Sequence, residues 1–97
     1  MRPVGFDDLR TAARALMAVP QDARGALCAR LLQRARWADC YVKRLSKLHP
    51  QWGDGTLRAA ARPEELAHER WLGDQEYRDC CMLVLSMLDP HVRVNSQ

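Results

Sequence analysis

A long segment between two prolines, residues 21–49, most constrains what this chain can fold into. We predict one helix there, from residue 21 or 22 to about Leu48. Pro20 and Pro50 are expected to bound it, because the residue before a proline avoids helical angles. Apolar residues recur at steps of four or three positions, the period of one helix face: Leu27, Leu31, Ala35, Ala38, Val42 and Leu45.

Two further segments have the same period. Residues 7–18 carry a single apolar stripe, and Asp7 and Asp8 suit the N-terminus of a helix as a cap and against its dipole. A last helix over 74–88, with Asp74 as its N-cap, is apolar on most sides and ends at a proline. Such a helix is either central to the core or half of an interface, and the sequence leaves both open.

Composition supports a helical fold. Ala, Leu and Arg dominate the 97 residues, isoleucine is absent, and strand-forming types are scarce. The length suits one domain with a single core. We therefore expect an all-α fold, a compact bundle of three main helices plus one or two short helices at 57–62 and within 64–71. It would form a single domain over residues 1–97, with flexible ends at 1–6 and 91–97.

The chain shows no signal-peptide pattern, and its longest apolar stretch, residues 80–88, is far shorter than the roughly 20 residues that cross a bilayer. A cytoplasmic protein with no membrane partner is expected by default. The four cysteines are then expected to be reduced and buried as small hydrophobic residues: Cys28, Cys40, Cys80 and Cys81.

Charge is unevenly distributed. Residues 21–50 hold seven basic and two acidic side chains, a net charge of +5, whereas residues 63–80 hold six acidic and two basic ones, a net charge of −4. The simplest interpretation is internal, with the acidic segment folded near the basic helix. The alternative is a basic face that is kept for a partner. Favourable i, i+4 ion pairs are predicted for Asp39–Lys43 and Asp74–Arg78.

Cationic and aromatic residues alternate along the long predicted helix at steps of four and three, so they should lie on one face: Arg30, Arg34, Trp37, Tyr41 and Arg44. Such a face suits phosphates and bases, or an acidic protein. The competing interpretation is a solvated surface whose aromatic rings are partly covered by the rest of the fold. A helix-turn-helix arrangement is disfavoured because the second helix is too long for a recognition helix.

The turn after this helix is the most distinctive local feature. As a binding site, it would offer an aromatic floor at Trp52 and polar groups at His49 and Asp54. As a structural feature, Trp52 would pin the loop to the core, Gly53 and Gly55 would take left-handed angles, and Asp54 would cap a helix. The turn lacks the glycine spacing and the lysine of a phosphate-binding loop.

These residues also carry a resemblance. The arginine-rich helix, the Leu-His-Pro-x-Trp-Gly-Asp-Gly stretch at residues 48–55 and the alanine run after it are similar to a group of small bacterial proteins of unknown function. The likeness spans most of the chain, and the stretch is its most specific part. It implies a bacterial, cytoplasmic origin but supplies no activity and no catalytic residues.

Catalysis and metal binding have little support. No two histidines or cysteines show a short ligand spacing such as Cys-x-x-Cys. A nucleophile needs an activating base and an orienting group in a cleft, and the few serines lie in a basic helix, an apolar helix and the C-terminal tail. We therefore expect no enzymatic activity, no cofactor and no metal.

The first hypothesis is a small protein–protein interaction module, an adaptor or regulatory subunit. It would bind another protein or itself, and a homodimer through residues 80–88 is one form. The alternative is a nucleic-acid-binding regulator that uses the basic second helix. Eight residues are the candidates for partner binding: Arg30, Arg34, Trp37, Tyr41, Arg44, His49, Trp52 and Asp54.

Overall fold

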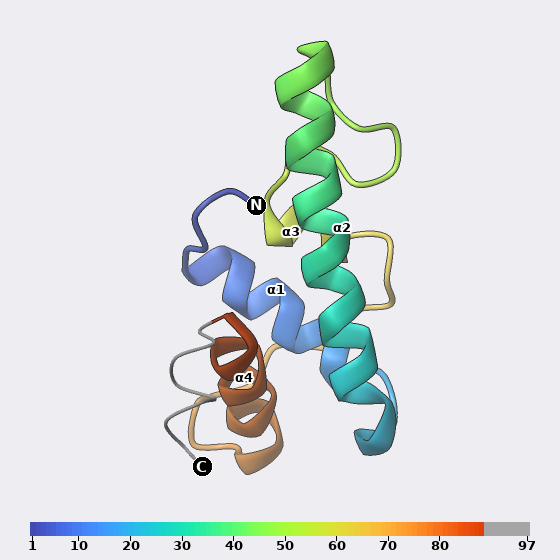
Figure 1. Cartoon of the computed structure of the whole chain (residues 1–97). Coiled ribbons are helices and arrows are strands. Elements are labelled where there is room, and N and C mark those ends of the chain that lie inside the picture. Colours follow the sequence, from blue (N-terminus) through green and yellow to red (C-terminus); the bar gives the residue numbers. More distant parts are fainter. Residues whose placement is uncertain (89–97) are drawn as a thin grey trace.

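The computed structural model describes residues 1–88 (Figure 1). Within that range it is all-α and contains no β-strand, which confirms the expected fold class of three main helices plus short ones. The predicted stop of the last helix at Asp89–Pro90 and the flexible end at 91–97 lie outside the described residues. The helices are α1 (Phe6–Met17), a 3-10 helix (Gln21–Ala23), α2 (Arg24–Leu45), α3 (Leu57–Ala61) and α4 (Gln75–Leu88).

Helix α1 lies at the centre of the fold and packs against α2, α3 and α4. The buried residues are mainly alanines, leucines and cysteines, so the helices can approach closely around a core of small and aliphatic side chains. Tyr77 is the one aromatic residue in the core of the described chain. The core residues include Ala12, Ala13 and Leu16 of α1, Leu27 and Leu31 of α2, Leu57 of α3, and Cys80 and Val84 of α4.

Helix α2 extends beyond the other helices. It begins beside α4, where Arg24 pairs with Glu76 (2.9 Å). Its 22 residues carry its other end about 33 Å away along the axis. Figure 1 shows the C-terminal half of α2 extending past the bundle with the following loop beside it. We call residues 37–56, the last turns of α2 and this loop, the arm.

Helix α2 ends at Leu45, so the predicted end near Leu48, closed by Pro50, is wrong. Ser46 adopts a left-handed conformation (φ 56°), and its N–H donates to the carbonyl of Val42 (2.8 Å). A left-handed residue at this position turns the chain out of the helix and satisfies a free carbonyl of the last turn. The chain therefore turns back along α2 four residues before the proline.

The helical turns expected within residues 64–71 are absent, and this prediction is wrong. The segment instead runs along α1, where Arg14 fixes it. The Ala67 N–H donates to the Arg14 carbonyl (3.1 Å), and Arg14 Nε donates to the Ala67 carbonyl (2.7 Å). The neighbouring helix thus satisfies backbone groups that local helical hydrogen bonds would otherwise have to satisfy.

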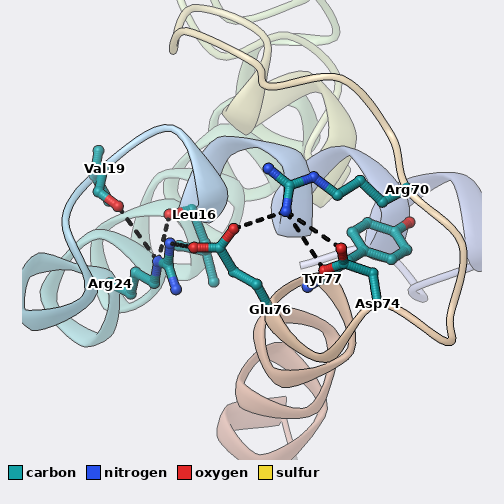
Figure 2. A network of polar contacts seen from close by, with 7 residues as sticks. All are labelled: Leu16, Val19, Arg24, Arg70, Asp74, Glu76 and Tyr77. Atoms are coloured by element: carbon teal, nitrogen blue, oxygen red, sulfur yellow. Dashed lines mark hydrogen bonds and ion pairs between the residues drawn. The ribbon is translucent and has the colours of Figure 1, made fainter.

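The start of α4 is tied to the rest of the molecule by the polar network in Figure 2. Asp74 caps the helix as predicted, because its Oδ1 accepts the Tyr77 N–H (3.0 Å). The predicted Asp74–Arg78 ion pair is wrong. Asp74 pairs with Arg70 (3.4 Å), which also reaches Glu76 (2.9 Å), and Arg78 donates to a loop carbonyl.

The acidic segment folds against the basic helix in part. Glu64 pairs with Arg34 of α2 (2.6 Å), and the Arg24–Glu76 pair joins α2 to α4. The predicted Asp39–Lys43 pair is confirmed at 3.0 Å. Internal pairing therefore accounts for only some of the positive charge on α2.

Three of the four cysteines are buried as expected. Burial raises the pKa of the Cys28 thiol to about 11 and also raises the pKa values of Cys80 and Cys81. Cys40 is exposed, so the expectation for this residue is wrong. Ala38 and Asp39 of the same turn are buried, so Cys40 lies on a face of α2 that the rest of the fold leaves uncovered.

Candidate functional site

The aromatic and cationic stripe of α2 and the turn that follows it form one surface. The loop folds back along the helix and brings its two ring-bearing residues over the exposed face. Residues of α2 and of the loop together line a hollow of about 540 Å³. We call its lining the arm surface: Trp37, Cys40, Tyr41, Arg44, Leu45, His49 and Trp52.

Four aromatic rings connect α2 to the loop. The Trp52 ring lies flat against His49, with centroids 4.6 Å apart and planes 3° from parallel. Trp52 also stacks on Trp37, with centroids 5.9 Å apart. Tyr41 meets the His49 ring edge-on at 4.9 Å. The loop is therefore held against the helix by ring contacts, and Trp37 remains 54% exposed.

His49 also fixes the backbone of the turn. Its Nδ1 accepts the N–H groups of both Gln51 and Trp52 (3.1 Å each). Its backbone N–H and carbonyl bond the carbonyl and N–H of Gly53 (2.8 and 3.1 Å). His49 thus holds the backbone of the turn through these hydrogen bonds, which we call the His49 bracket, and its ring also lines the hollow.

The two glycines allow the loop to lie close to the helices. Gly53 and Gly55 have φ angles of 74° and 95°, which confirms the predicted left-handed angles. A Cβ atom on Gly55 would lie 2.7 Å from Cα and Cβ of Asp39, and one on Gly53 would lie 2.8 Å from Cβ of Ala59. The close approach of the loop to α2 and α3 therefore requires residues without a side chain.

Asp54 lies outside the hollow and serves the loop. Its Oδ1 accepts the backbone N–H (3.0 Å) and the hydroxyl (2.8 Å) of Thr56, and its other oxygen faces Arg2 (3.4 Å). The hydrogen bonds from Thr56 lower the pKa of this carboxyl. Thr56, not Asp54, caps α3 by accepting the Ala59 N–H (3.1 Å). Asp54 is thus a structural residue of the turn.

Two arginines of the predicted set also lie outside the lining. Arg34 donates to Glu64 (2.6 Å), and its guanidinium carbon lies 5.9 Å from the centre of the Trp52 ring. Its charge is therefore balanced within the protein. Arg30 is exposed on α2, one turn before Arg34. Of the eight sequence-predicted residues, five meet at the hollow: Trp37, Tyr41, Arg44, His49 and Trp52.

The arm keeps an unbalanced positive charge. Arg44 lines the hollow, and no acidic side chain of residues 1–88 lies within ion-pair distance of it. Three more cations of residues 1–88 have no acidic side chain within ion-pair distance. They are Arg30 and Arg36, which lie on α2 before the arm, and Lys47 in the arm. Asp39 is near the base of the arm, but it already pairs with Lys43 and the Met1 amino group.

A second exposed apolar region lies where α1, α4 and the 62–74 loop meet. Its α4 part falls within residues 80–88, for which the sequence predicts a candidate interface, whereas its Phe6 and loop residues were not predicted. Phe6 and Trp71 are each 89% exposed and line a hollow of about 350 Å³. Phe6 also borders a smaller hollow of about 150 Å³ together with Leu85 of α4. We call this region the α1–α4 face, and its exposed side chains are Phe6, Trp71, Leu72, Met82 and Leu85.

The face could have been suspected from one local signal. Trp71 and Leu72 are adjacent apolar residues in a segment that is otherwise strongly charged. Helical periodicity cannot find such a pair because the segment is a loop. Within α4, Cys80, Cys81 and Val84 are buried and Met82 and Leu85 are exposed, so the helix is covered on one side only.

Over residues 1–88, no cluster of three or more His, Cys, Asp or Glu side chains could hold a metal ion. In this range, no helix combines the length and the apolar character that a bilayer span requires.

The fold and the hollow define a small all-α domain with an exposed aromatic and cationic surface. Residues 2–88 match the family model described as Domain of unknown function (DUF7742), and the chain belongs to that family. This confirms the expected relation to an uncharacterised group. No curated protein matches the chain, and no solved structure matches it.

Proposed function

We propose that the protein is a small, non-catalytic interaction module of the bacterial cytoplasm that binds an acidic, apolar segment of another protein at the arm surface. One observation carries the proposal: aromatic rings from α2 and from the loop surround a hollow of about 540 Å³ beside a cation without an acidic partner in residues 1–88. A carboxylate would pair with Arg44, and an apolar side chain would enter the hollow.

The residue types of the arm surface support a protein partner. Trp, Tyr and Arg are the residues that most often carry the binding energy of protein interfaces, where they act as anchors in desolvated pockets. Trp37, Tyr41 and Arg44 are adjacent at the arm. Leu45 and Leu48 are also exposed there and extend the apolar area beyond the rings. Aliphatic side chains favour an apolar side chain over a nucleic-acid base.

The arm surface is also rigid before it binds. The His49 bracket, the stacked rings and the tight approach of Gly55 to Asp39 fix the loop on α2. A preformed site loses little conformational entropy on binding, so more of the contact energy is available as affinity.

A nucleic-acid partner is the second candidate, because four cations on α2 and just after it have no acidic partner within residues 1–88: Arg30, Arg36, Arg44 and Lys47. Exposed rings beside cations are typical of single-strand binding. However, Trp52 already stacks on His49 and Trp37. The rings already stacked on Trp52 therefore leave less ring surface on which a base could stack.

The test is a pull-down with tagged protein from nuclease-treated and untreated extract of the source cells, followed by mass spectrometry. Trp37→Ser and Arg44→Glu alter the arm surface. Trp71→Ser is the matched control because it makes the same change at an exposed tryptophan outside the arm. We expect a protein partner that survives nuclease, that the wild type and Trp71→Ser retain, and that both arm variants lose.

Two outcomes would contradict this proposal. If recovery disappears after nuclease treatment and binding weakens steeply with salt, the nucleic-acid candidate replaces it, because phosphate contacts release counterions. If the arm variants recover the same partner as the wild type, the arm is not the binding surface.

A further inference from the structure

The α1–α4 face exposes its aromatic side chains from a fixed backbone. The carbonyl of Trp71 accepts the Asp74 N–H (2.9 Å), and the carbonyl of Leu72 accepts from Arg78 (3.1 Å). Arg70, just before them, reaches both Asp74 and Glu76, as Figure 2 shows. The backbone that carries Trp71 is therefore held by polar contacts on both sides. A fixed and almost fully exposed tryptophan is typical of an interface anchor.

The charges around this face are balanced, in contrast to those of the arm. Three charged side chains line the larger hollow, and each has an opposite partner: Arg10 pairs with Glu69 (3.5 Å), and Arg70 with Glu76 (2.9 Å). Two identical faces can therefore meet without net repulsion. A strongly charged partner would have no unpaired charge to meet at the hollow, so charge favours a second copy of this chain.

The face carries protrusions and hollows side by side, which a self-complementary contact requires. It carries protruding side chains, Phe6 and Trp71, and beside them two hollows of about 350 and 150 Å³. In a two-fold arrangement, a residue of each copy meets the same patch of the other, so every protrusion can enter a hollow twice. The face contains both halves of such a contact.

The exposed area is also in the range that a dimer needs. Two aromatic side chains of this size can bury on the order of 300–400 Å² together, close to half of the roughly 800 Å² per partner in a standard interface. Phe6 and Trp71 supply this part because each is 89% exposed. Leu72, Met82 and Leu85 extend the apolar area on the loop and α4.

From these observations we infer that the protein forms a two-fold symmetric homodimer through the α1–α4 face, with Trp71 and Phe6 of each copy packed into the hollows of the other. This surface is separate from the arm, so the inference does not depend on the proposed function. In such a dimer, the second copy would cover the exposed side of α4.

Sedimentation equilibrium on the full chain tests the inference. We expect a wild-type dimer with a dissociation constant in the micromolar range or tighter, as for interfaces of standard size. Trp71→Ser should weaken it by about 30-fold or more, the effect of losing an interface anchor. Trp37→Ser is the matched control and should leave the dimer unchanged. Circular dichroism checks that both variants keep their helix content.

Leu72→Ser is the second variant, to be used if Trp71→Ser fails to fold. A wild type that remains a monomer at all concentrations would overturn the inference. It would also be overturned if Trp37→Ser dissociated the dimer while the variants of the α1–α4 face did not, because the arm would then be the contact. Neither sedimentation result bears on the proposed function. The pull-down tests that function separately, because it expects the partner to be lost only when the arm surface is altered.

Discussion

Gly55 is the residue on which the position of the loop most directly depends. Its φ angle of 95° and the 2.7 Å approach to Asp39 leave no room for a Cβ atom. We expect Gly55→Ala to destabilise the fold by about 2–4 kcal/mol, through backbone strain and overpacking against helix backbone. Urea denaturation followed by circular dichroism measures this change.

Gly25→Ala is the control for this substitution. Gly25 lies near the start of α2, and nothing would contact its new Cβ atom within 4 Å. We expect its stability to stay the same or to rise by up to about 1 kcal/mol, because alanine is the better helix former. Equal losses in the two variants would show that the left-handed turn is not what makes Gly55 necessary.

Cys40 should report on the arm because it is the exposed cysteine of the four. Burial raises the pKa values of Cys28, Cys80 and Cys81 and shields them, so they react slowly with thiol reagents in the folded protein. We expect one fast-reacting thiol in the native state and four after denaturation, with peptide mapping placing the fast one at Cys40. Fast labelling of a second cysteine in the native state would contradict the packing of α4.

Arg24 joins three helices at the base of α2. Its side chain donates to the carbonyls of Leu16 (2.9 Å) and Val19 (3.3 Å), just after or within the last turn of α1, and pairs with Glu76 of α4. We expect Arg24→Met to destabilise the fold by about 1.5–3 kcal/mol, because these hydrogen bonds involve a charged donor. Arg30→Met, at an exposed position of the same helix, should change the stability by less than about 0.5 kcal/mol in the same denaturation experiment.

The network at the start of α4 predicts acid sensitivity. Folding lowers the pKa of Asp74 through the Tyr77 N–H and lowers that of Glu76 through Arg24. A carboxyl group whose pKa is lowered by folding stabilises the protein above its unfolded pKa and loses this effect as the pH falls. The melting temperature should therefore drop progressively below about pH 5.

Asp74→Asn should flatten this pH dependence, because an amide keeps an acceptor for the Tyr77 N–H and does not titrate. An equally steep fall in melting temperature for the variant would mean that the acid sensitivity arises elsewhere, for example at Asp39. The pKa of Asp39 is also lowered, first by its hydrogen bond to Lys43.

The helices with regular apolar periods were predictable, and their ends only in part. The stripe of residues 7–18 and the apolar positions of α2 from Leu27 to Ala38 follow from burial on one face, and the Asp74 cap follows from local chemistry. The last predicted position of that series, Leu45, is 50% exposed, so the prediction is wrong there. The end of α2 does not, because no residue preference signals the left-handed turn at Ser46. The 62–74 loop was missed because its backbone is satisfied by Arg14, a partner distant in sequence.

The candidate site was likewise predictable only in part. Helical spacing predicts that Trp37, Tyr41 and Arg44 share a face. Only the fold shows that the loop returns over that face, because this depends on the early end of α2 and on the packing of Gly55 against Asp39. Exposure of the α1–α4 face depends on which side of α4 the other helices leave uncovered, and a pattern that is apolar nearly all round does not reveal that side.

The inferred dimer makes the stability of the protein depend on its own concentration. A contact that exists only between folded copies stabilises the folded state by mass action. The melting temperature of the wild type should therefore rise with protein concentration, and that of Trp71→Ser should begin to rise only at a concentration about 30-fold higher. Differential scanning calorimetry over a wide range of concentrations measures this dependence, and a rise that begins at the same concentration in both proteins would contradict the dimer.

The length of α2 affects how tightly a dimer could bind a target that displays several copies of the acidic segment. Helix α2 carries the arm about 33 Å from the end of the helix that meets α4. Two molecules joined at the α1–α4 face would therefore present two arm surfaces well away from their contact. Once one arm is bound, the second meets its site at a high effective concentration, and avidity can exceed the single-site affinity by about 10²–10⁴. A weak arm would then suffice on a target that displays its acidic segment repeatedly, and would release readily from one that displays it once.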